Sequence, residues 1–433
     1  MKKLLILLCV AAAVPAAIAA EAGGATHLSF HDALQRAIEV NNDIERSRAE
    51  VPAAEANRKY VLSQVLPRLN ASGATTRNTE QVLFGNGADA RTILPLNDWS
   101  YRVVLSQPIF AGLRDQRVYA QAKLGVSNAQ QGVFGTEDAV LLRVASNYLA
   151  VVDADARIDI EKQNIALAEK RREQANAFYQ AGEVTKVDVL RAETAIKSAQ
   201  RLLAVAQQNR ENAVSLLRTD LDLDTAITVD HPDNPIPPPP DEQSLEVRAE
   251  TARPDVALAA NNLRISQLET QKQRGFWWPI VTFDAGFIDQ KSAFPASRYG
   301  YGAFRFTVPI FQAGEVEARV AGAHERELQS QLSLDTAKMN AREDVRRAFA
   351  DVRSSDTSLQ LAKEQLTAAQ AEYDQAFELY RAQETTSLDL AEAETALADA
   401  RRAVAEETLN HALSQLRVWY SAGALKEAVG VQK

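Results

Sequence analysis

Two long stretches of the chain have the hydrophobic pattern of helices. No proline occurs within residues 110–230 or 311–433, and both stretches are rich in Ala, Leu, Glu, Gln and Arg, which favour helix. In the first stretch, apolar residues recur every three or four positions, at Leu141, Ala145, Tyr148, Val152 and Ala156. A helix over residues 112–180 would be roughly 100 Å long at about 1.5 Å per residue. We therefore predict helices that are too long for a compact globular domain.

Alanine marks the seam on which these helices are expected to pack. It recurs every seven residues after the first long run, at Ala192, Ala199, Ala206 and Ala213. The second half keeps Ala393 and Ala400, and the row then breaks at Glu407 and Ser414. A strict seven-residue repeat predicts a coiled-coil seam, and alanine on it allows two helices to approach closely.

A pattern with a period of two precedes each long helical stretch. Apolar and aromatic residues alternate with other residues at Trp99, Tyr101, Val103 and Leu105, and again at Val281, Phe283, Ala285 and Phe287. This alternation is typical of strands in an outer-membrane barrel. We predict one strand hairpin over about residues 67–108 and another over about 279–309. Four strands cannot close a transmembrane barrel, whose smallest forms have about eight, so we expect several copies of the chain to complete it.

One phrase is written twice in the chain. "YQAGEVTKVDVLRAET" begins at Tyr179 and "YRAQETTSLDLAEAET" begins at Tyr380, which is 201 positions later. Gly182 suits the end of one helix, and a threonine followed three residues later by an aspartate suits the start of the next. The second copy keeps the threonine and the aspartate but has Gln383 in place of the glycine. We predict that each phrase is the tip of a helical hairpin.

The duplication extends beyond these tips and divides the chain into two repeats. Upstream of the strands the offset between matching residues becomes 212, so the first copy carries a longer, exposed loop between its strands. We assign the repeats to residues 21–221 and 247–425. Residues 222–246 contain "HPDNPIPPPPDE" and are expected to be an extended linker without a helix of its own. Residues 426–433 are expected to be loose.

The ends and the charge narrow the class of protein. Residues 1–20 have a basic start, an apolar middle and small residues at the end, as in a cleaved signal peptide. The only cysteine, Cys9, lies in this segment, so the mature chain is expected to have no disulfide and no cysteine metal site. The formal net charge is -9, and loss of Lys2 and Lys3 makes it -11, which argues against a nucleic-acid partner.

No catalytic constellation is evident in the sequence. The histidines lack the spacing of a metal site and are scattered at His27, His31, His231, His324 and His411. Phosphate-binding loops and nucleophile-elbow motifs are not found, and the helical charge pattern accounts for the many carboxylates. We expect no enzyme, no cofactor and no metal.

The order of these elements resembles the TolC-like outer-membrane efflux proteins. The best local matches are "LPRLNASG" at Leu66, "LSQPIFAGLRDQRV" at Leu105, "AGEVTKVDVLRAE" at Ala181 and "TTSLDLAEAE" at Thr385. The resemblance runs from Leu28 to Leu425 and covers nearly the whole mature chain. The first hairpin tip and its alanine heptads look closest to the branch that serves type I secretion and drug efflux.

The resemblance implies a fold and a set of partners. The fold would be mainly α with a membrane β-barrel: duplicated helical hairpins form a tunnel through the periplasm, and a homotrimer closes a barrel of twelve strands in the outer membrane. A periplasmic adaptor and an inner-membrane transporter would dock beneath it, and the channel itself would be passive. The rival interpretation is a periplasmic coiled-coil adaptor or scaffold without a pore.

The family's acidic aperture maps to the second hairpin tip. Asp389 and Glu392 occupy the matching positions, and their spacing of three places them on one face of a helix. Three copies would surround a narrow opening with like charges, which attract cations and repel anions. Asp389 could equally cap its helix together with Thr386, as Asp188 could with Thr185, and the two roles can coexist.

The resemblance also implies a polar link between hairpins in the closed state. Tyr380 and Asp188 match such a pair, in which a phenol donates to a carboxylate. Thr385 stands where the family has an arginine, so the latch is expected to be weaker or built differently; a lone tyrosine could also serve only in packing. The tip residues that match the adaptor-facing region, although turn and cap chemistry also explains them, are Gly182, Glu183, Thr185, Gln383, Glu384 and Thr386.

Overall fold

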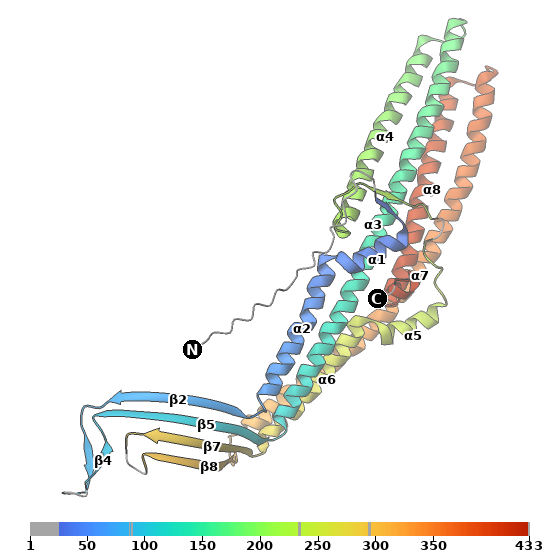
Figure 1. Cartoon of the computed structure of the whole chain (residues 1–433). Coiled ribbons are helices and arrows are strands. Elements are labelled where there is room, and N and C mark those ends of the chain that lie inside the picture. The colour runs from blue at the N-terminus through green and yellow to red at the C-terminus, as the bar shows by residue number, and fades with distance from the viewer. Residues whose placement is uncertain (1–25, 86, 88–89, 233–234, 293–295, 432–433) are drawn as a thin grey trace, which may run out of the picture.

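The computed structural model describes residues 26–85, 87, 90–232, 235–292 and 296–431. The expected signal peptide at residues 1–20 lies outside this part of the chain. The protein is elongated, with a β-sheet at one end of the helices and two hairpin tips at the other (Figure 1). No helix in the described residues is both long enough and apolar enough to cross a lipid bilayer.

Four long helices form the body, as the hydrophobic pattern predicts. They are α3 (Arg114–Gln180), α4 (Lys186–Asp220), α7 (Glu315–Arg381) and α8 (Ser387–Ser421). α3 and α7 each have 67 residues, α4 and α8 each have 35, and every boundary in the second pair lies 201 positions after its counterpart. The alanine seam is buried where it was expected, for example at Ala192, Ala393 and Ala400. The two copies therefore fold into the same hairpin.

Shorter helices repeat at the other offset. They are α1 (Phe30–Val40), α2 (Asn42–Ser63), α5 (Glu242–Ala252) and α6 (Pro254–Arg274). The starts of α5 and α6 lie 212 positions after those of α1 and α2. α3 contacts α2 and α6, and α6 contacts α7, so these helices continue a single layer from the hairpins to the sheet (Figure 1).

The sheet combines one strand hairpin from each repeat. Its antiparallel order is β2-β5-β7-β8, with bounds Arg68–Arg77, Asn97–Ala111, Ile280–Gln290 and Arg298–Thr307. β5 runs beyond the predicted end at residue 108. Pro108 has no N–H to donate to the neighbouring strand, and a register shift between Pro108 and Phe110 lets the pairing continue past it. The longer loop of the first copy carries a further small hairpin, β3 (Val82–Phe84) with β4 (Arg91–Leu94).

The prediction that residues 222–246 are an extended linker without a helix was wrong in one respect, the start of α5, and the segment also contains a paired strand. The short strand β6 (Ile227–Val229) pairs in parallel with β1 (Thr26–Leu28). The helix α5 begins inside the segment at Glu242. Asp241 caps its start, because the Asp241 side chain accepts a hydrogen bond from the Ser244 amide. The connector is also fastened to the bundle, because Trp419 Nε1 donates to the Pro237 carbonyl at 2.9 Å.

The C-terminal segment is also packed, where it had been expected to be loose. α9 (Leu425–Ala428) follows α8, and both Val429 and Val431 are buried in the main core cluster. Lys426 Nζ lies 2.6 Å from Glu137 on α3. Apolar side chains and this ion pair give the segment enough contacts to order it; residues 432–433 lie outside the described part.

The core with most buried apolar residues lies midway along the body, where α1, α3, the connector and the C-terminus meet. Tyr148 is fully buried there, and its hydroxyl donates to the carbonyls of Leu28, at 3.1 Å, and Asp230, at 3.0 Å. These two carbonyls belong to the β1 and β6 region, so the tyrosine ties that small sheet to α3. The middle of the body is therefore the best-packed region, and thinner regions extend from it toward the tips and the sheet.

Candidate functional site

The first hairpin tip joins α3 to α4 through the turn that the sequence predicts. Gly182 has a φ of 80°, in the left-handed region that glycine adopts at low cost. Thr185 precedes α4, and both its amide and its hydroxyl donate to Asp188 Oδ2, at 3.3 and 3.1 Å. Asp188 is therefore a capping residue, which is the structural role considered for it above.

The second tip repeats this geometry with a residue less suited to it. Gln383 has a φ of 62°, although a residue with a Cβ adopts this conformation at a cost. Asp389 Oδ2 accepts hydrogen bonds from the hydroxyls of Thr386 and Thr385, both at 2.7 Å, and from the Thr386 amide at 3.0 Å. These bonds, led by that of the Thr386 hydroxyl, lower the pKa of Asp389 to about 2, so it stays ionised at any physiological pH.

The two acidic residues proposed for the aperture lie on the start of α8. Asp389 caps this helix and remains exposed, and Glu392, one turn later, is also exposed. The corresponding pair on α4 is Asp188 and Arg191, whose charges lie 3.7 Å apart. These two positions are therefore both negatively charged in the second tip, whereas in the first tip they carry opposite charges that cancel.

The two tips contact each other within the chain. Gln383 Nε2 donates to Glu183, and Ser387 Oγ donates to Asp188 Oδ1. The Ser387 hydroxyl is the main cause of the lowered pKa of Asp188. Sequence reasoning did not identify Ser387, because a single serine in a helix N-terminus carries no sign of a partner 199 residues away.

Tyr380 lies at this contact without making the expected hydrogen bond. Its side chain is buried, its ring packs edge-to-face on Phe178 with centroids 5.6 Å apart, and its hydroxyl has no hydrogen-bond partner among the described residues. Burial, and then the charge of Asp188, raise the pKa of Tyr380. The structure thus brings Tyr380 and Asp188 together but gives the hydrogen bond to Ser387.

Buried ion pairs hold the two hairpins together above the tips. Arg402 on α8 forms a two-pronged pair with Glu161 on α3, at 2.8 and 3.2 Å, and Glu161 is almost fully buried. Closer to the tips, Arg171 on α3 lies 2.5 Å from Glu394 on α8. Burial raises the pKa of Glu394, and the positive charge of Arg171 opposes this effect. The sequence did not predict these pairs, because the long helices carry many charged residues and their spacing does not show which of them meet.

The sheet has two chemically different faces. Directly paired residues of an antiparallel sheet share a face, so the register assigns each side chain to one of them. Tyr101, Val103, Leu105, Phe287 and Phe304 lie on one face, and all are exposed. The other face carries the polar and charged residues Asn70, Ser72, Arg102, Ser106, Asp284 and Arg305. Both edge strands, β2 and β8, pair with only one neighbour in the described chain.

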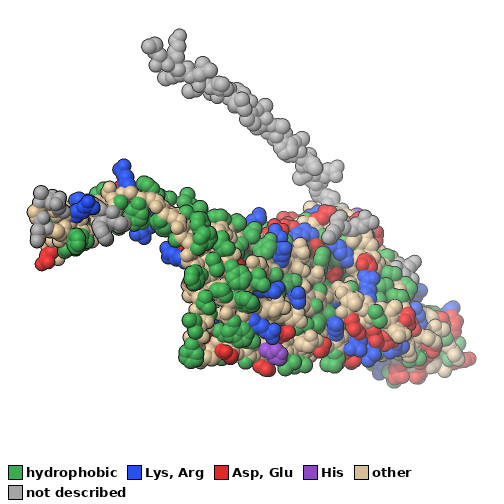
Figure 2. Space-filling model, turned by 90° about the horizontal axis from the view of Figure 1, so that it is seen from below, with side chains coloured by type: hydrophobic (Ala, Val, Ile, Leu, Met, Phe, Trp, Pro, Cys, Tyr) green, Lys and Arg blue, Asp and Glu red, His purple; other side chains and the backbone are tan. Residues whose placement is uncertain are grey.

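Hydrophobic side chains also gather where the helices meet the sheet, on the face seen in Figure 2. Trp277 and Trp278 precede β7 and are both about half exposed, and Ile310 and Phe311 follow β8 with 95% and 85% exposure. Aromatic residues at the end of an apolar strand region are typical of a membrane–water interface.

A family model described as "Outer membrane efflux protein" matches residues 33–221 and 246–423, which includes both tips and the whole four-stranded sheet. The chain belongs to the outer membrane efflux protein family. This membership places it in the outer membrane and favours the channel over the poreless periplasmic scaffold.

Relatives of this efflux protein are similar over most of their length. It is 24% identical to the outer membrane protein TolC of Escherichia coli (strain K12) over 412 residues, which cover 89% of this chain and 80% of that protein. It is also 24% identical to the pyoverdine export outer membrane protein OpmQ of Pseudomonas aeruginosa over 383 residues, which cover 86% and 80%.

Solved structures of outer-membrane channels have the same fold. A structure of CusC superimposes with a TM-score of 0.80 at 18% identity, covering 91% of this chain and 92% of that one. The open state of MtrE from Neisseria gonorrhoeae gives a TM-score of 0.75 at 19% identity, covering 92% and 89%. At these identities the likeness establishes the fold of the efflux protein and nothing about its substrate.

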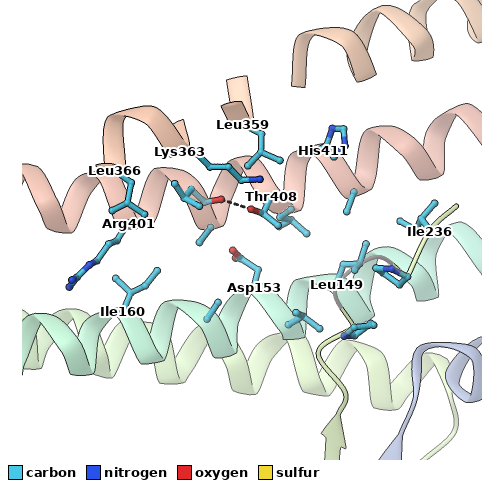
Figure 3. Close-up of a pocket in the computed structure, with 18 of the residues that line it drawn as sticks. Leu149, Asp153, Ile160, Ile236, Leu359, Lys363, Leu366, Arg401, Thr408 and His411 are labelled. Atoms are coloured by element: carbon cyan, nitrogen blue, oxygen red, sulfur yellow. Dashed lines mark hydrogen bonds between the residues drawn. The ribbon is translucent and has the colours of Figure 1, made fainter. Parts of the chain in front are cut away.

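A cavity of about 550 Å³ lies between α3, α7, α8 and the connector of the efflux protein (Figure 3). Its lining is mostly apolar, and the labelled polar side chains include Asp153, Arg401 and His411. His411 Nδ1 lies 3.3 Å from Ser355 Oγ, but that hydroxyl donates to the Val352 carbonyl of its own helix. The other ring nitrogen lies 3.0 Å from Gln415 Nε2. Among the described residues, the hydrogen-bond partners of the His411 ring are therefore the side chains of Ser355 and Gln415.

Proposed function

We propose that this chain is the outer-membrane exit duct of a tripartite efflux or type I secretion system, in which three copies close one barrel. The observation that carries the proposal is a four-stranded sheet with one exposed apolar face and two open edges. An open edge in lipid would leave backbone groups without partners, at several kcal/mol for each group. If β8 of one copy pairs with β2 of the next, three copies make twelve strands without an edge.

The helices support a tunnel with the same symmetry. α4 contacts α3, α3 contacts α8 and α8 contacts α7, so the tip half of the chain is one layer with α4 and α7 at its borders. Three such layers side by side form a closed wall around a bore. Exposed apolar residues near these borders, such as Leu190 and Leu361, are available for contacts between copies.

The tips would form the periplasmic end of this tunnel. Asp389 and Glu392 from three copies form the acidic aperture, and Asp188, together with Ser387 and the neighbouring Tyr380, forms the link that holds the tips closed. The adaptor would contact the outermost residues, which are Gly182, Glu183, Thr185, Gln383, Glu384 and Thr386. Transport through the duct is passive, and the inner-membrane transporter supplies the energy.

Fractionation and conductance test the proposal together. The full-length chain, expressed in a Gram-negative cell, should remain with outer membranes and migrate as a heat-sensitive trimer. The purified trimer should give discrete conductance steps in a planar bilayer. A chain that is recovered only as a freely soluble monomer, and that produces no steps, would contradict the proposal.

A further inference from the structure

The polar face of the sheet carries an excess of positive charge. Arg68, Arg102 and Arg305 lie on it by register, as do the acidic residues Asp98 and Asp284. Arg305 Nε lies 3.1 Å from Asp284 Oδ2, so this pair is neutral. Asp98 lies near the end of the sheet that is far from the helices, and Arg68 lies at the end next to them.

Arg102 stands apart from the other charges on this face. It occupies the interior of β5, where its direct partners are Ser72 on β2 and Ile288 on β7. Its side chain is exposed, and no ion pair forms on it within the described chain. Asp98 lies four positions before Arg102 on β5, and Ser106, the direct partner of Asp284, lies four positions after it. Each acidic residue is therefore about 14 Å from Arg102 along the strand direction. Its positive charge is therefore not neutralised locally.

We propose that Arg102 from three copies forms a ring of positive charge inside the barrel, and that this ring makes the outer part of the duct favour anionic solutes. The proposal rests on the trimeric channel proposed above, in which the apolar face meets lipid and the polar face lines the bore. Twelve strands spaced about 4.8 Å apart and tilted about 40° give a wall of about 12 Å radius. Because arginine projects inward from that wall, the whole bore lies within about one Debye length of the charges at 0.1 M salt.

The ring and the aperture have opposite signs at the two ends of the duct. The acidic pair Asp389 and Glu392 would discriminate against anions at the tips, whereas Arg102 would discriminate against cations in the barrel. An anionic solute that has passed the tips therefore finds a more favourable potential in the barrel. The selectivity of the whole channel is the combined result, so the contribution of the ring is measured as a change on substitution.

Reversal potentials under a KCl gradient in planar bilayers test the ring. Arg102→Gln should lower the ratio of chloride to potassium permeability by about twofold at 0.1 M salt, and Arg102→Glu should lower it further. Both effects should grow at 0.01 M salt, where the Debye length is about 30 Å. Arg102→Lys keeps the charge and should keep the wild-type ratio.

A control variant removes an arginine from the other face at the neighbouring level, where Arg298 Nε lies 3.2 Å from Asp289 Oδ1. Arg298 pairs in register with Asp289, which pairs with Tyr101, so Arg298 lies on the apolar face. Arg298→Gln should leave the permeability ratio unchanged. A conducting channel whose ratio is the same in wild type, Arg102→Gln and Arg102→Glu would overturn the ring and leave the duct intact. Trimers that insert but carry no current would overturn the duct, and the ring with it.

Discussion

Asp188 has a different partner from the one that the family resemblance implied. The resemblance paired it with Tyr380, but Ser387 donates the hydrogen bond, and the Tyr380 hydroxyl has no hydrogen-bond partner among the described residues. Sequence could identify Asp188 as a cap and as a tip residue, because both follow from local spacing. It could not identify the donor, because that depends on how two tips from opposite halves of the chain are placed.

This difference predicts the effects of two small substitutions. Ser387→Ala removes a hydrogen bond to a charged acceptor, worth roughly 1.5–3 kcal/mol, and should raise the resting conductance of the purified channel to small ions. Tyr380→Phe removes only a hydroxyl without a partner and keeps the packing on Phe178, so its conductance should equal that of the wild type. Single-channel recordings at neutral pH measure both variants. If Tyr380→Phe opens the channel as much as Ser387→Ala, the assignment of the link is wrong.

At the scale of the elements, the repeats explain how much the sequence could predict. The long helices have strong periodicity over tens of residues, so the extent of α3 and the shared offset of 201 were evident from the sequence. The segments that were missed are short: β6 has three residues and α9 has four. These segments are held in place by partners that are distant in the sequence: β6 pairs with β1, and Lys426 pairs with Glu137. A local sequence pattern does not show such partners.

The pair between Arg402 and Glu161 predicts a strong coupling between α8 and α3. Arg402→Ala would leave the buried carboxylate of Glu161 without its cationic partner, which typically costs about 3–5 kcal/mol. The variant trimer should therefore dissociate on heating at a markedly lower temperature than the wild type. The exchanged pair, Glu161→Arg with Arg402→Glu, should recover part of the loss. A double variant no more stable than the worse single variant would show that the direct pair does not carry the effect.

The junction of sheet and helices depends on a close approach of two glycines. Gly112 has a φ of 65°, and a Cβ on it would lie 2.1 Å from the Gly275 carbonyl oxygen. Gly112→Ala should therefore destabilise the junction by more than about 2 kcal/mol and reduce the yield of inserted trimer. Gly125→Ala and Gly132→Ala are matched controls, since both lie in α3 with open space around the new Cβ, and both should insert normally. Equal yields for all three variants would contradict the close approach.

At the scale of the whole molecule, the proposed function makes the chain one part of a tube that it cannot close by itself. Both edges of its sheet are open in the described chain, and one face of that sheet exposes Phe304 and Phe306 at 71% and 76%. The pairing of β5 with β7 also crosses between the two repeats, so neither half could form this sheet alone. These features are explained together if β8 of each copy continues into β2 of the next.

Disulfide crosslinking across this junction tests that claim most directly. Cys9, the only cysteine, lies in the expected signal peptide, so introduced cysteines would report without interference. One cysteine replaces Ala74 on β2, and a second is moved along β8 through positions 298–307. The account predicts covalent ladders that end at three subunits, strong at positions in register on the face of Ala74 and weak one residue away, because paired Cβ atoms lie about 4.5–5.5 Å apart. No crosslink at any position, or ladders that continue past three, would contradict it.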